Sequence, residues 1–300
     1  MLTIIGLMSG TSADGIDVAL VSTDGHSKCR LLDSHFASYR DSTRAEILLA
    51  RDDPAHYLAD ANRMEALTTA ITEDHLSSFI HFLNNPNYNI DLIGFHGQTI
   101  YHNPQIGRTV QLGDGMALAR QTGIDVIYDF RRADIEAGGE GAPLAPVYHQ
   151  FLVTSAGIPQ PAVIINIGGV ANLTFIDNAN DVIAGYDIGP GNCLIDEWIR
   201  KNSDKNFDEN GLIGKSGKVN DLILNQAIDN FSNFSIDKSL DVKDFDISFA
   251  KGLSLEDGCA TITKFTAYLI AENLKNLDKE ENDLNINILC GGGRKNNLLI

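Results

Sequence analysis

The pattern of apolar positions alternates between short strand-like runs and longer helix-like stripes. Residues 2–7 and 16–21 are apolar runs joined by small polar residues, which is typical of a strand, a tight turn and a returning strand. Between residues 64 and 83 apolar side chains recur at helical spacing, and Pro86 is expected to stop that helix. This mixture of strands and helices predicts an α/β fold.

The unit of strand, glycine turn and strand occurs twice, about half the chain apart. Its second copy spans residues 162–177 and turns at Gly168 and Gly169. The repetition predicts two related α/β domains that each present a hairpin to a shared cleft. The linker-like residues 155–161 separate the copies, so we expect an N-terminal domain over 1–158 and a C-terminal domain over 159–300.

Glycine-rich loops follow four of the predicted strands, at residues 10–15, 168–169, 189–192 and 291–293. Glycines after strands let a ligand approach the backbone, and consecutive N–H groups there bind anions. A tight turn is the simpler explanation of any one loop, whereas the four together favour nucleotide binding. The last loop is expected to start a helix, yet the chain stops at Ile300, which suggests truncation.

Polar side chains of the first loop extend this hypothesis. Thr11 and Ser12 could donate to phosphate oxygens, while Asp14 and Asp17 could hold a hydrated divalent cation. Two familiar phosphate motifs are not present. Residues 211–216 lack the first glycine of a Walker loop, and no Gly-x-Gly-x-x-Gly follows the first strand.

The net charge of the chain disfavours negatively charged macromolecular partners. The chain has 23 Lys and Arg against 40 Asp and Glu, a net charge of −17, so neither nucleic acid nor an anionic membrane is expected to bind. Apolar runs are too short for a membrane span. The four cysteines have neither zinc-site nor disulfide-framework spacing, and no secretory signal precedes the first strand, so a cytoplasmic location is predicted.

Candidate catalytic or binding residues also occur in three other segments. Asp187 ends an apolar strand beside a glycine turn, where it could act as a general base or simply stabilise the turn. His96 also ends a strand, and a structural role is the simpler explanation there. Arg131 and Arg132 lie close to Asp134; an arginine could bind a carboxylate or phosphate, or pair with the aspartate.

Seven motifs, in this order along the chain, resemble the anhydro-N-acetylmuramic acid kinase family. They are MSGTSADGID at 8–17, GFHGQT at 94–99, DFRRAD at 129–134, GGEGAPL at 138–144, NIGGVANL at 166–173, GYDIGPGN at 185–192 and CGGGRKN at 290–296. The resemblance implies an actin-like ATPase (ribonuclease H-like) fold with two related α/β domains around a nucleotide cleft. It also implies Mg²⁺-dependent use of ATP, a homodimer, and conversion of 1,6-anhydro-N-acetylmuramic acid to N-acetylmuramic acid 6-phosphate in cytoplasmic recycling of cell-wall sugar.

The resemblance also assigns roles to individual positions. Asp187 would activate the attacking water, and Asp14 or Asp17 could hold the metal ion through water. The sugar would be held by His96, Gln98, Arg131 and Asp134. The nucleotide would be held by Gly10, Thr11, Ser12, Ala13, Asp14, Gly15, Ile16, Asp17, Gly168, Gly169, Asn172, Gly291, Gly292 and Gly293.

The chain departs from the family pattern in three respects. Glu140 stands where glutamine is usual, and residues 238–245 diverge from a conventional Lys-Ser-Thr-Gly-Arg-Glu type of segment. The family also continues past residue 300, through helices that close the fold and carry a glutamate near the sugar. Two alternatives stay open: another small-molecule kinase or phosphatase of this fold, and a nucleotide-binding protein without transfer activity.

Overall fold

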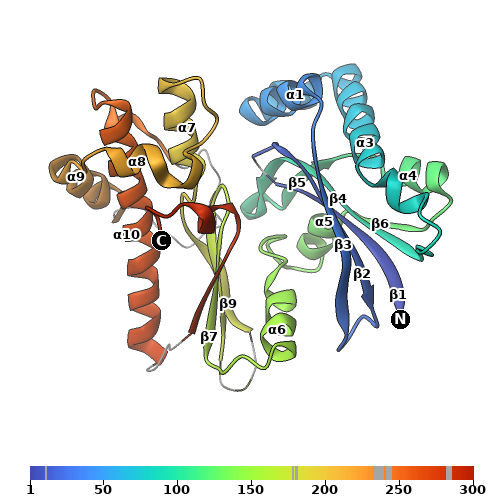
Figure 1. Cartoon of the computed structure of the whole chain (residues 1–300). Coiled ribbons are helices and arrows are strands. Elements are labelled where there is room, and N and C mark those ends of the chain that lie inside the picture. Colours follow the sequence, from blue (N-terminus) through green and yellow to red (C-terminus); the bar gives the residue numbers. More distant parts are fainter. Residues whose placement is uncertain (11, 178, 180–181, 233–239, 241–244, 282–285) are drawn as a thin grey trace. The chain divides into compact units, whose positions relative to one another are not determined.

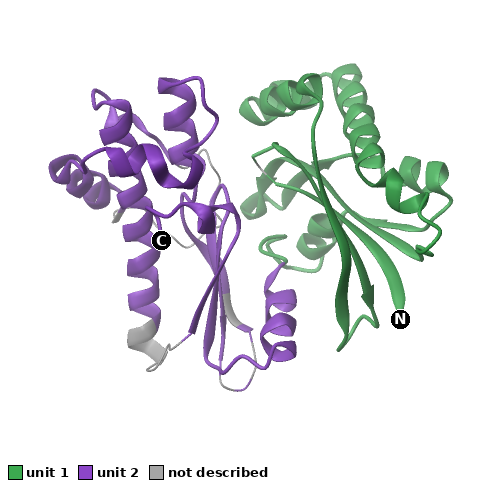
Figure 2. Cartoon of the chain, viewed as in Figure 1, with its two compact units in different colours: residues 1–144 green, residues 145–300 purple. Residues whose placement is uncertain are grey.

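The computed structural model describes the chain from Met1 to Ile300 except residues 11, 178, 180–181, 233–239, 241–244 and 282–285 (Figure 1). It consists of two compact units, Met1–Leu144 and Ala145–Ile300 (Figure 2). In the described part of the chain, no helix is both long enough and apolar enough to cross a membrane.

Unit 1 is built on a six-stranded sheet. Its strands are β1 (Leu2–Ser9), β2 (Gly15–Thr23), β3 (Cys29–Ser38), β4 (Leu92–Asn103), β5 (Arg108–Leu112) and β6 (Val126–Tyr128). Their order is β3-β2-β1-β4-β5, with β6 also paired to β4. β1 is antiparallel to β2 and parallel to β4, so the β1–β2 turn and the middle of β4 lie at the same end of β1.

Helices cover this sheet and close its core. They are α1 (Asp41–Asp52), α2 (Pro54–Ala59), α3 (Ala61–Leu83), α4 (Gly115–Thr122) and α5 (Phe130–Glu136), with a 3₁₀ turn at Pro104–Ile106. Asp60 caps α3 by accepting from the N–H of Arg63. The apolar stripe predicted for this helix is confirmed, because Ile71 and Phe79 are fully buried with Ile5 and Ile93 of the sheet. Burial of each such side chain contributes about 1.5–3 kcal/mol.

Unit 2 repeats the strand arrangement of unit 1. Its strands are β7 (Ala162–Ile167), β8 (Ala171–Ile176), β9 (Val182–Gly189) and β10 (Ile286–Cys290), in the order β10-β7-β8-β9. β7 is antiparallel to β8 and parallel to β10, just as β1 is to β2 and β4. The prediction of two related α/β domains, each with a glycine-turned hairpin, is therefore confirmed.

Helices cover both faces of the second sheet. They are α6 (Pro146–Ser155), α7 (Cys193–Asn202), α8 (Leu212–Ser216), α9 (Asp221–Ser232) and α10 (Leu255–Glu281), with 3₁₀ turns at Glu209–Gly211, Ser248–Ala250 and Gly292–Lys295. Ile165 and Leu173 pack with residues of α10, and Ile164 packs with Val153 of α6. Two covered faces explain why β7 is an almost continuous apolar run.

The division between the units differs from the sequence prediction of 1–158 and 159–300. Val153 of α6 is buried against Ala162 and Ile176, so this helix belongs to the core of unit 2. The chain consequently divides between Leu144 and Ala145, before α6 rather than in the linker-like segment after it.

Candidate functional site

Two backbone carbonyls of the turn between β1 and β2 are held by hydrogen bonds within unit 1. The Gly10 carbonyl accepts from the N–H of Ala13 at 3.2 Å and from Nε2 of Gln98 at 3.2 Å. The Ala13 carbonyl accepts from Nε of Arg44 at 3.1 Å. Because a C=O and the following N–H point in opposite directions across a planar peptide, the N–H of Asp14 points away from Arg44. A turn held in this way is suited to an anion.

The two glycines at the ends of this turn differ in how closely the protein packs around them. A Cβ on Gly15 would lie 2.5 Å from both the Phe36 ring and the Ala37 carbonyl oxygen, so β3 excludes any side chain there. A Cβ on Gly10 would meet only Ser12 Oγ, at 3.7 Å. The protein's own packing therefore does not require glycine at position 10, whereas it does at position 15.

Carboxylates gather beside the same turn. Ser12 Oγ donates to Asp14 Oδ1 at 2.6 Å. Partial burial, and then the neighbouring charge of Asp14, raise the pKa of Asp17. A divalent cation would relieve this repulsion, although no cluster of three or more metal-ligating side chains occurs among the described residues. Two carboxylates suit an ion that keeps most of its waters. Ile16 is fully buried, so only its backbone could face a nucleotide.

Gln98 lies beneath the turn rather than in an open site. Its Oε1 accepts from Ser9 Oγ at 2.5 Å and Tyr39 Oη at 3.3 Å, while its Nε2 donates to the carbonyls of Gly10 and Thr99 at 3.2 and 3.1 Å. The side chain is 0% exposed. The interpretation of Gln98 as a sugar contact does not fit this geometry, because its amide is already occupied by the protein.

His96 and Arg131 form a second group in unit 1. His96 Nδ1 lies 2.8 Å from the Gly97 carbonyl oxygen, and Arg131 Nε donates to His96 Nε2 at 2.9 Å. These contacts assign the imidazole proton to Nδ1. Burial, and then the charge of Arg131, lower the pKa of His96 to about 4. The imidazole is therefore neutral and orients the guanidinium without competing with it for an anion.

Asp134 shapes the loop beside Arg131. Its Oδ2 accepts from the N–H of Gly141 at 2.7 Å, and Nη1 of Arg131 donates to the Gly141 carbonyl at 2.7 Å. A Cβ on Gly139 would collide with the Asp134 carboxylate. Asp134 thus organises the glycine loop whose Gly141 carbonyl accepts from Arg131. Arg132 instead forms an ion pair with Asp129.

A polar row crosses the sheet of unit 2. Asn166, Asn172 and Asp187 occupy paired positions on β7, β8 and β9, and Cys290 of β10 pairs with Asn166. Directly paired residues share a face of a sheet, so the row lies on the α6 side, beyond the apolar residues that α6 covers. Asp187 is half-buried, and its Oδ2 accepts from the N–H of Leu240 at 2.8 Å.

Two irregularities in β9 set the position of Asp187. Ile176 pairs with Val182 but Phe175 pairs with Ala184, and Asn172 pairs with Asp187 but Ala171 pairs with Gly189. β9 therefore has one extra residue on each side of the segment that ends at Asp187. Bulges of this kind re-aim side chains and are common beside functional sites.

The start of α7 supports the β7–β8 turn. The N–H groups of Asn192 and Cys193 donate to the carbonyls of Gly168 and Gly169 at 2.8 and 3.0 Å, and Nδ2 of Asn192 donates to the Gly168 carbonyl at 3.0 Å. Asn192 precedes α7 but its side chain makes no helix-capping hydrogen bond; its amide holds the turn instead. A Cβ on Gly191 would lie 2.5 Å from the Gly168 oxygen.

In the loop after β10, as in the first hairpin, some glycines are required by packing and one is not. Gly291 has φ of 79°, and a Cβ there would lie 2.5 Å from Asn166 Oδ1 and from the Ile167 carbonyl oxygen. A Cβ on Gly293 would collide with the side chain of Ile167. On Gly292 it would meet no described atom within 4 Å. At Gly292, as at Gly10, the surrounding residues leave room for a side chain.

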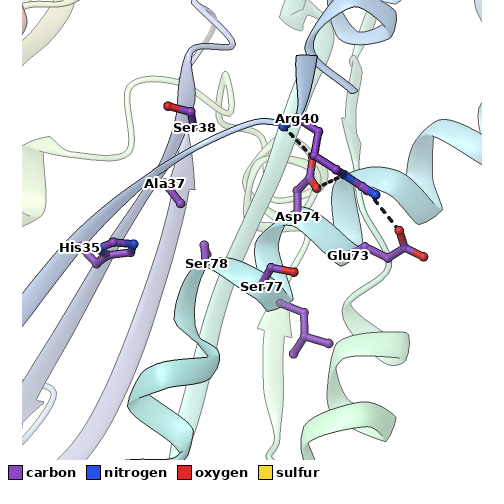
Figure 3. A pocket seen from close by; sticks show the side chains of 9 residues that line it. His35, Ala37, Ser38, Arg40, Glu73, Asp74, Ser77 and Ser78 are labelled. Carbon is purple, nitrogen blue, oxygen red and sulfur yellow. Dashed lines mark hydrogen bonds and ion pairs between the residues drawn. The ribbon is translucent and has the colours of Figure 1, made fainter. Parts of the chain in front are cut away.

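Other predicted positions lie elsewhere or outside the described residues. Thr11 and most of the divergent segment 238–245 are outside them. A cavity of about 440 Å³ lies between β3 and α3, and none of the predicted site residues lines it. Its charges are satisfied internally, since Arg40 is paired with Asp74 and with Glu73 (Figure 3).

Known proteins provide an independent comparison. The family model described as anhydro-N-acetylmuramic acid kinase matches residues 2–300. A protein of that name from Pelagibacter ubique is 43% identical over 98% of this chain and 80% of its own length. Another, from Rhizorhabdus wittichii, is 40% identical over 99% of this chain and 81% of its own. A solved ROK family glucokinase from Streptomyces griseus, in complex with glucose and AMPPNP, has a TM-score of 0.43 and 14% identity over 99% of this chain and 86% of that structure.

The resemblance carried by the seven motifs is therefore confirmed over almost the whole chain. The relatives are about 40% identical to it, and the chain spans about four-fifths of their length. By these matches the chain belongs to the anhydro-N-acetylmuramic acid kinase family.

Proposed function

We propose that this chain is an ATP-dependent kinase that converts 1,6-anhydro-N-acetylmuramic acid to N-acetylmuramic acid 6-phosphate. The match of the family model over residues 2–300 carries this proposal. The chemistry consists of attack by water at the anomeric carbon, cleavage of the bond from that carbon to the bridging oxygen, and transfer of the γ-phosphoryl group to the released 6-oxygen. ADP is the second product.

The glycine turns are proposed to hold the nucleotide. The Gly10–Asp17 hairpin and the Gly168–Gly169 turn would bind phosphate oxygens, and the loop at Gly292 would approach the adenosine. Mg²⁺ would be held by Asp14 and Asp17 through water and would neutralise charge on the phosphates. The carbonyls of Gly10 and Ala13 are tied inward, which supports this assignment because it presents donors to the anion.

Asp187 is proposed as the general base. It would take a proton from the attacking water, which increases the nucleophilicity of the water oxygen as the anhydro ring opens. The N–H of Leu240 donates to one carboxylate oxygen and so fixes its orientation. Its position in a row with Asn166 and Asn172 supports a role in chemistry, because partial burial of a carboxylate costs free energy that a neutral side chain at this position would not.

Arg131 is proposed to bind the lactyl carboxylate of the sugar. A guanidinium matches a carboxylate in charge and in planar geometry. The neutral His96 at its Nε and the Gly141 carbonyl at its Nη1 hold the group in one orientation. Homodimer formation, which the family resemblance implies, and a cytoplasmic location are proposals of the same kind.

The assignment is tested by incubating the purified chain with Mg-ATP and the anhydro-sugar and analysing the products by mass spectrometry. We expect ADP and a product whose mass increases by one water and one phosphoryl group. EDTA should abolish product formation. Turnover of an ordinary hexose but not of the anhydro-sugar would favour another kinase of this fold. Nucleotide binding without any product would favour a nucleotide-binding protein.

A further inference from the structure

The buried amide of Gln98 matches its surroundings atom by atom. Its two N–H donors face two backbone carbonyls, those of Gly10 and Thr99, while its single oxygen faces two hydroxyls, those of Ser9 and Tyr39. Rotating the amide by half a turn would place its oxygen against both carbonyls, so only one orientation satisfies the group. This position thus requires a side chain with both N–H donors and an acceptor oxygen, as glutamine has, and not only one of the right volume.

The contacts of this amide join four segments of unit 1. Ser9 is the last residue of β1, Gln98 lies in β4, Tyr39 follows β3, and Gly10 opens the β1–β2 turn. Ser9 Oγ also lies 3.0 Å from the carbonyl oxygen of Gly15, where β2 begins. The amide and its hydroxyl partners therefore contact both ends of the turn that has been assigned to the phosphates.

The hydrogen-bonding groups of this cluster are shielded from water. Ser9, Tyr39 and Gln98 are 1%, 4% and 0% exposed. Burial raises the pKa of Tyr39, so its hydroxyl retains its proton and donates to Gln98. Hydrogen bonds shielded from water in this way are directional and costly to leave unmade.

We propose that Gln98, with Ser9 and Tyr39, is a clamp that sets the orientation of the Gly10 peptide and thereby positions the turn for the nucleotide phosphates. These residues contact no ligand themselves; they are positioning residues. The inference rests on the proposed function, since it assumes that the β1–β2 turn binds phosphate. It replaces the interpretation of Gln98 as a sugar contact, and the two make opposite predictions for substrate affinity.

Gln98→Glu is the most informative variant. It preserves shape but places carboxylate oxygens against the carbonyls of Gly10 and Thr99, so the turn should shift. We expect the Kd of Mg-ADP to rise about 10-fold or more and kcat to fall, while KM for the anhydro-sugar stays within about 2-fold. The matched control is Gln111→Glu on the neighbouring strand, whose Nε2 also donates twice, to Thr99 Oγ1 and Thr109 Oγ1. It should leave the Kd of Mg-ADP unchanged.

Two milder variants keep the test valid if Gln98→Glu does not fold. Ser9→Ala and Tyr39→Phe each remove one hydroxyl, and each should weaken Mg-ADP binding about 3- to 10-fold. Their controls are Ser78→Ala and Tyr57→Phe, which remove hydroxyls from residues that are each 2% exposed but bond to the His75 carbonyl and to Glu46. The controls should lower Tm to a similar degree and leave nucleotide affinity unchanged.

The outcomes separate the clamp from the proposed function. Wild-type protein that binds no Mg-ADP would contradict the proposed function, and the clamp's role with it. Wild-type binding, together with unchanged affinity in folded Ser9→Ala and Gln98→Glu, would overturn the clamp alone. Loss of sugar affinity with normal nucleotide affinity in Gln98→Glu would restore the interpretation of Gln98 as a substrate contact.

Discussion

At Gly15 a side chain would collide with Phe36, whereas at Gly10 a Cβ would find ordinary contact distances. The same contrast separates Gly291 and Gly293 from Gly292 in the loop after β10. Glycines of one motif thus differ: packing within the protein excludes a side chain at Gly15, Gly291 and Gly293 but not at Gly10 and Gly292. Substitution at the sterically open positions is the cleaner probe of binding.

We predict that Gly10→Val folds with little change in Tm and weakens Mg-ATP binding on the order of tenfold or more, because the added side chain occupies space that phosphate needs. Gly15→Val should instead lower Tm, since it displaces β3. Calorimetric titration and thermal melting of both variants check this pair of outcomes. Normal nucleotide affinity in folded Gly10→Val would show that the β1–β2 turn does not bind the nucleotide.

Asp187→Asn should preserve the fold and both substrate affinities but lower kcat by about 10²–10⁴-fold, because the amide cannot accept the proton of water. A residue that merely stabilised the turn would cost about 1 kcal/mol of stability and spare kcat. The matched control is Asp246→Asn, an exposed turn aspartate of unit 2 that accepts from the N–H of Ser248. Steady-state kinetics and melting of the two variants are the measurement, and near-normal turnover in Asp187→Asn would refute its assignment as base.

Among the elements of unit 1, β4 and α3 carry histidines whose protonation opposes folding. Burial lowers the pKa of His75 to about 4, and burial with the charge of Arg131 does the same for His96. Below the ordinary value of 6.5, the unfolded chain binds a proton at each site that the folded chain does not. The stability contributed by the neutral forms is therefore complete above pH 6.5 and is lost as the pH falls towards 4.

We predict that the free energy of unfolding decreases by about 1.4 kcal/mol per pH unit for each of these histidines between pH 6 and pH 4.5. Urea unfolding at several pH values measures the slope. His75→Leu should remove about half of this contribution, whatever it does to stability at pH 7.5. An unchanged slope in that variant would show that His75 does not stay neutral in the folded protein.

The sequence allowed the elements to be predicted better than the contacts between them. Periodicity identifies β1, β2, β7 and α3 because burial of one face imposes a regular pattern on local residues. The positions of Ser9, Tyr39 and Arg44 around the first turn depend on how distant segments pack, so no spacing reveals their roles. The same limit explains Asn192, whose local pattern suits a helix cap although its amide holds the β7–β8 turn.

For the whole molecule, the net charge of −17 opposes the approach of an anionic nucleotide. Arg44 and Arg131 offset this field only near the turn and the proposed sugar site. We predict that the association rate of Mg-ATP rises as salt screens the repulsion, by about 2- to 3-fold between roughly 20 and 200 mM NaCl. Stopped-flow measurement with a fluorescent nucleotide checks the sign; a rate that falls with salt would indicate local attraction that outweighs the global charge.

The two extra residues of β9 have a consequence for how the family can vary in length. Asp187 pairs with Asn172 of β8. The irregularity between Val182 and Ala184 contains one residue of β9 that has no partner in β8. A relative that lost a single residue there could straighten the strand and still keep its carboxylate opposite the asparagine. One residue of β9 can therefore be deleted near position 183 without displacing the proposed base. We expect relatives that are shorter in this strand to lack a residue there, rather than between residues 184 and 187.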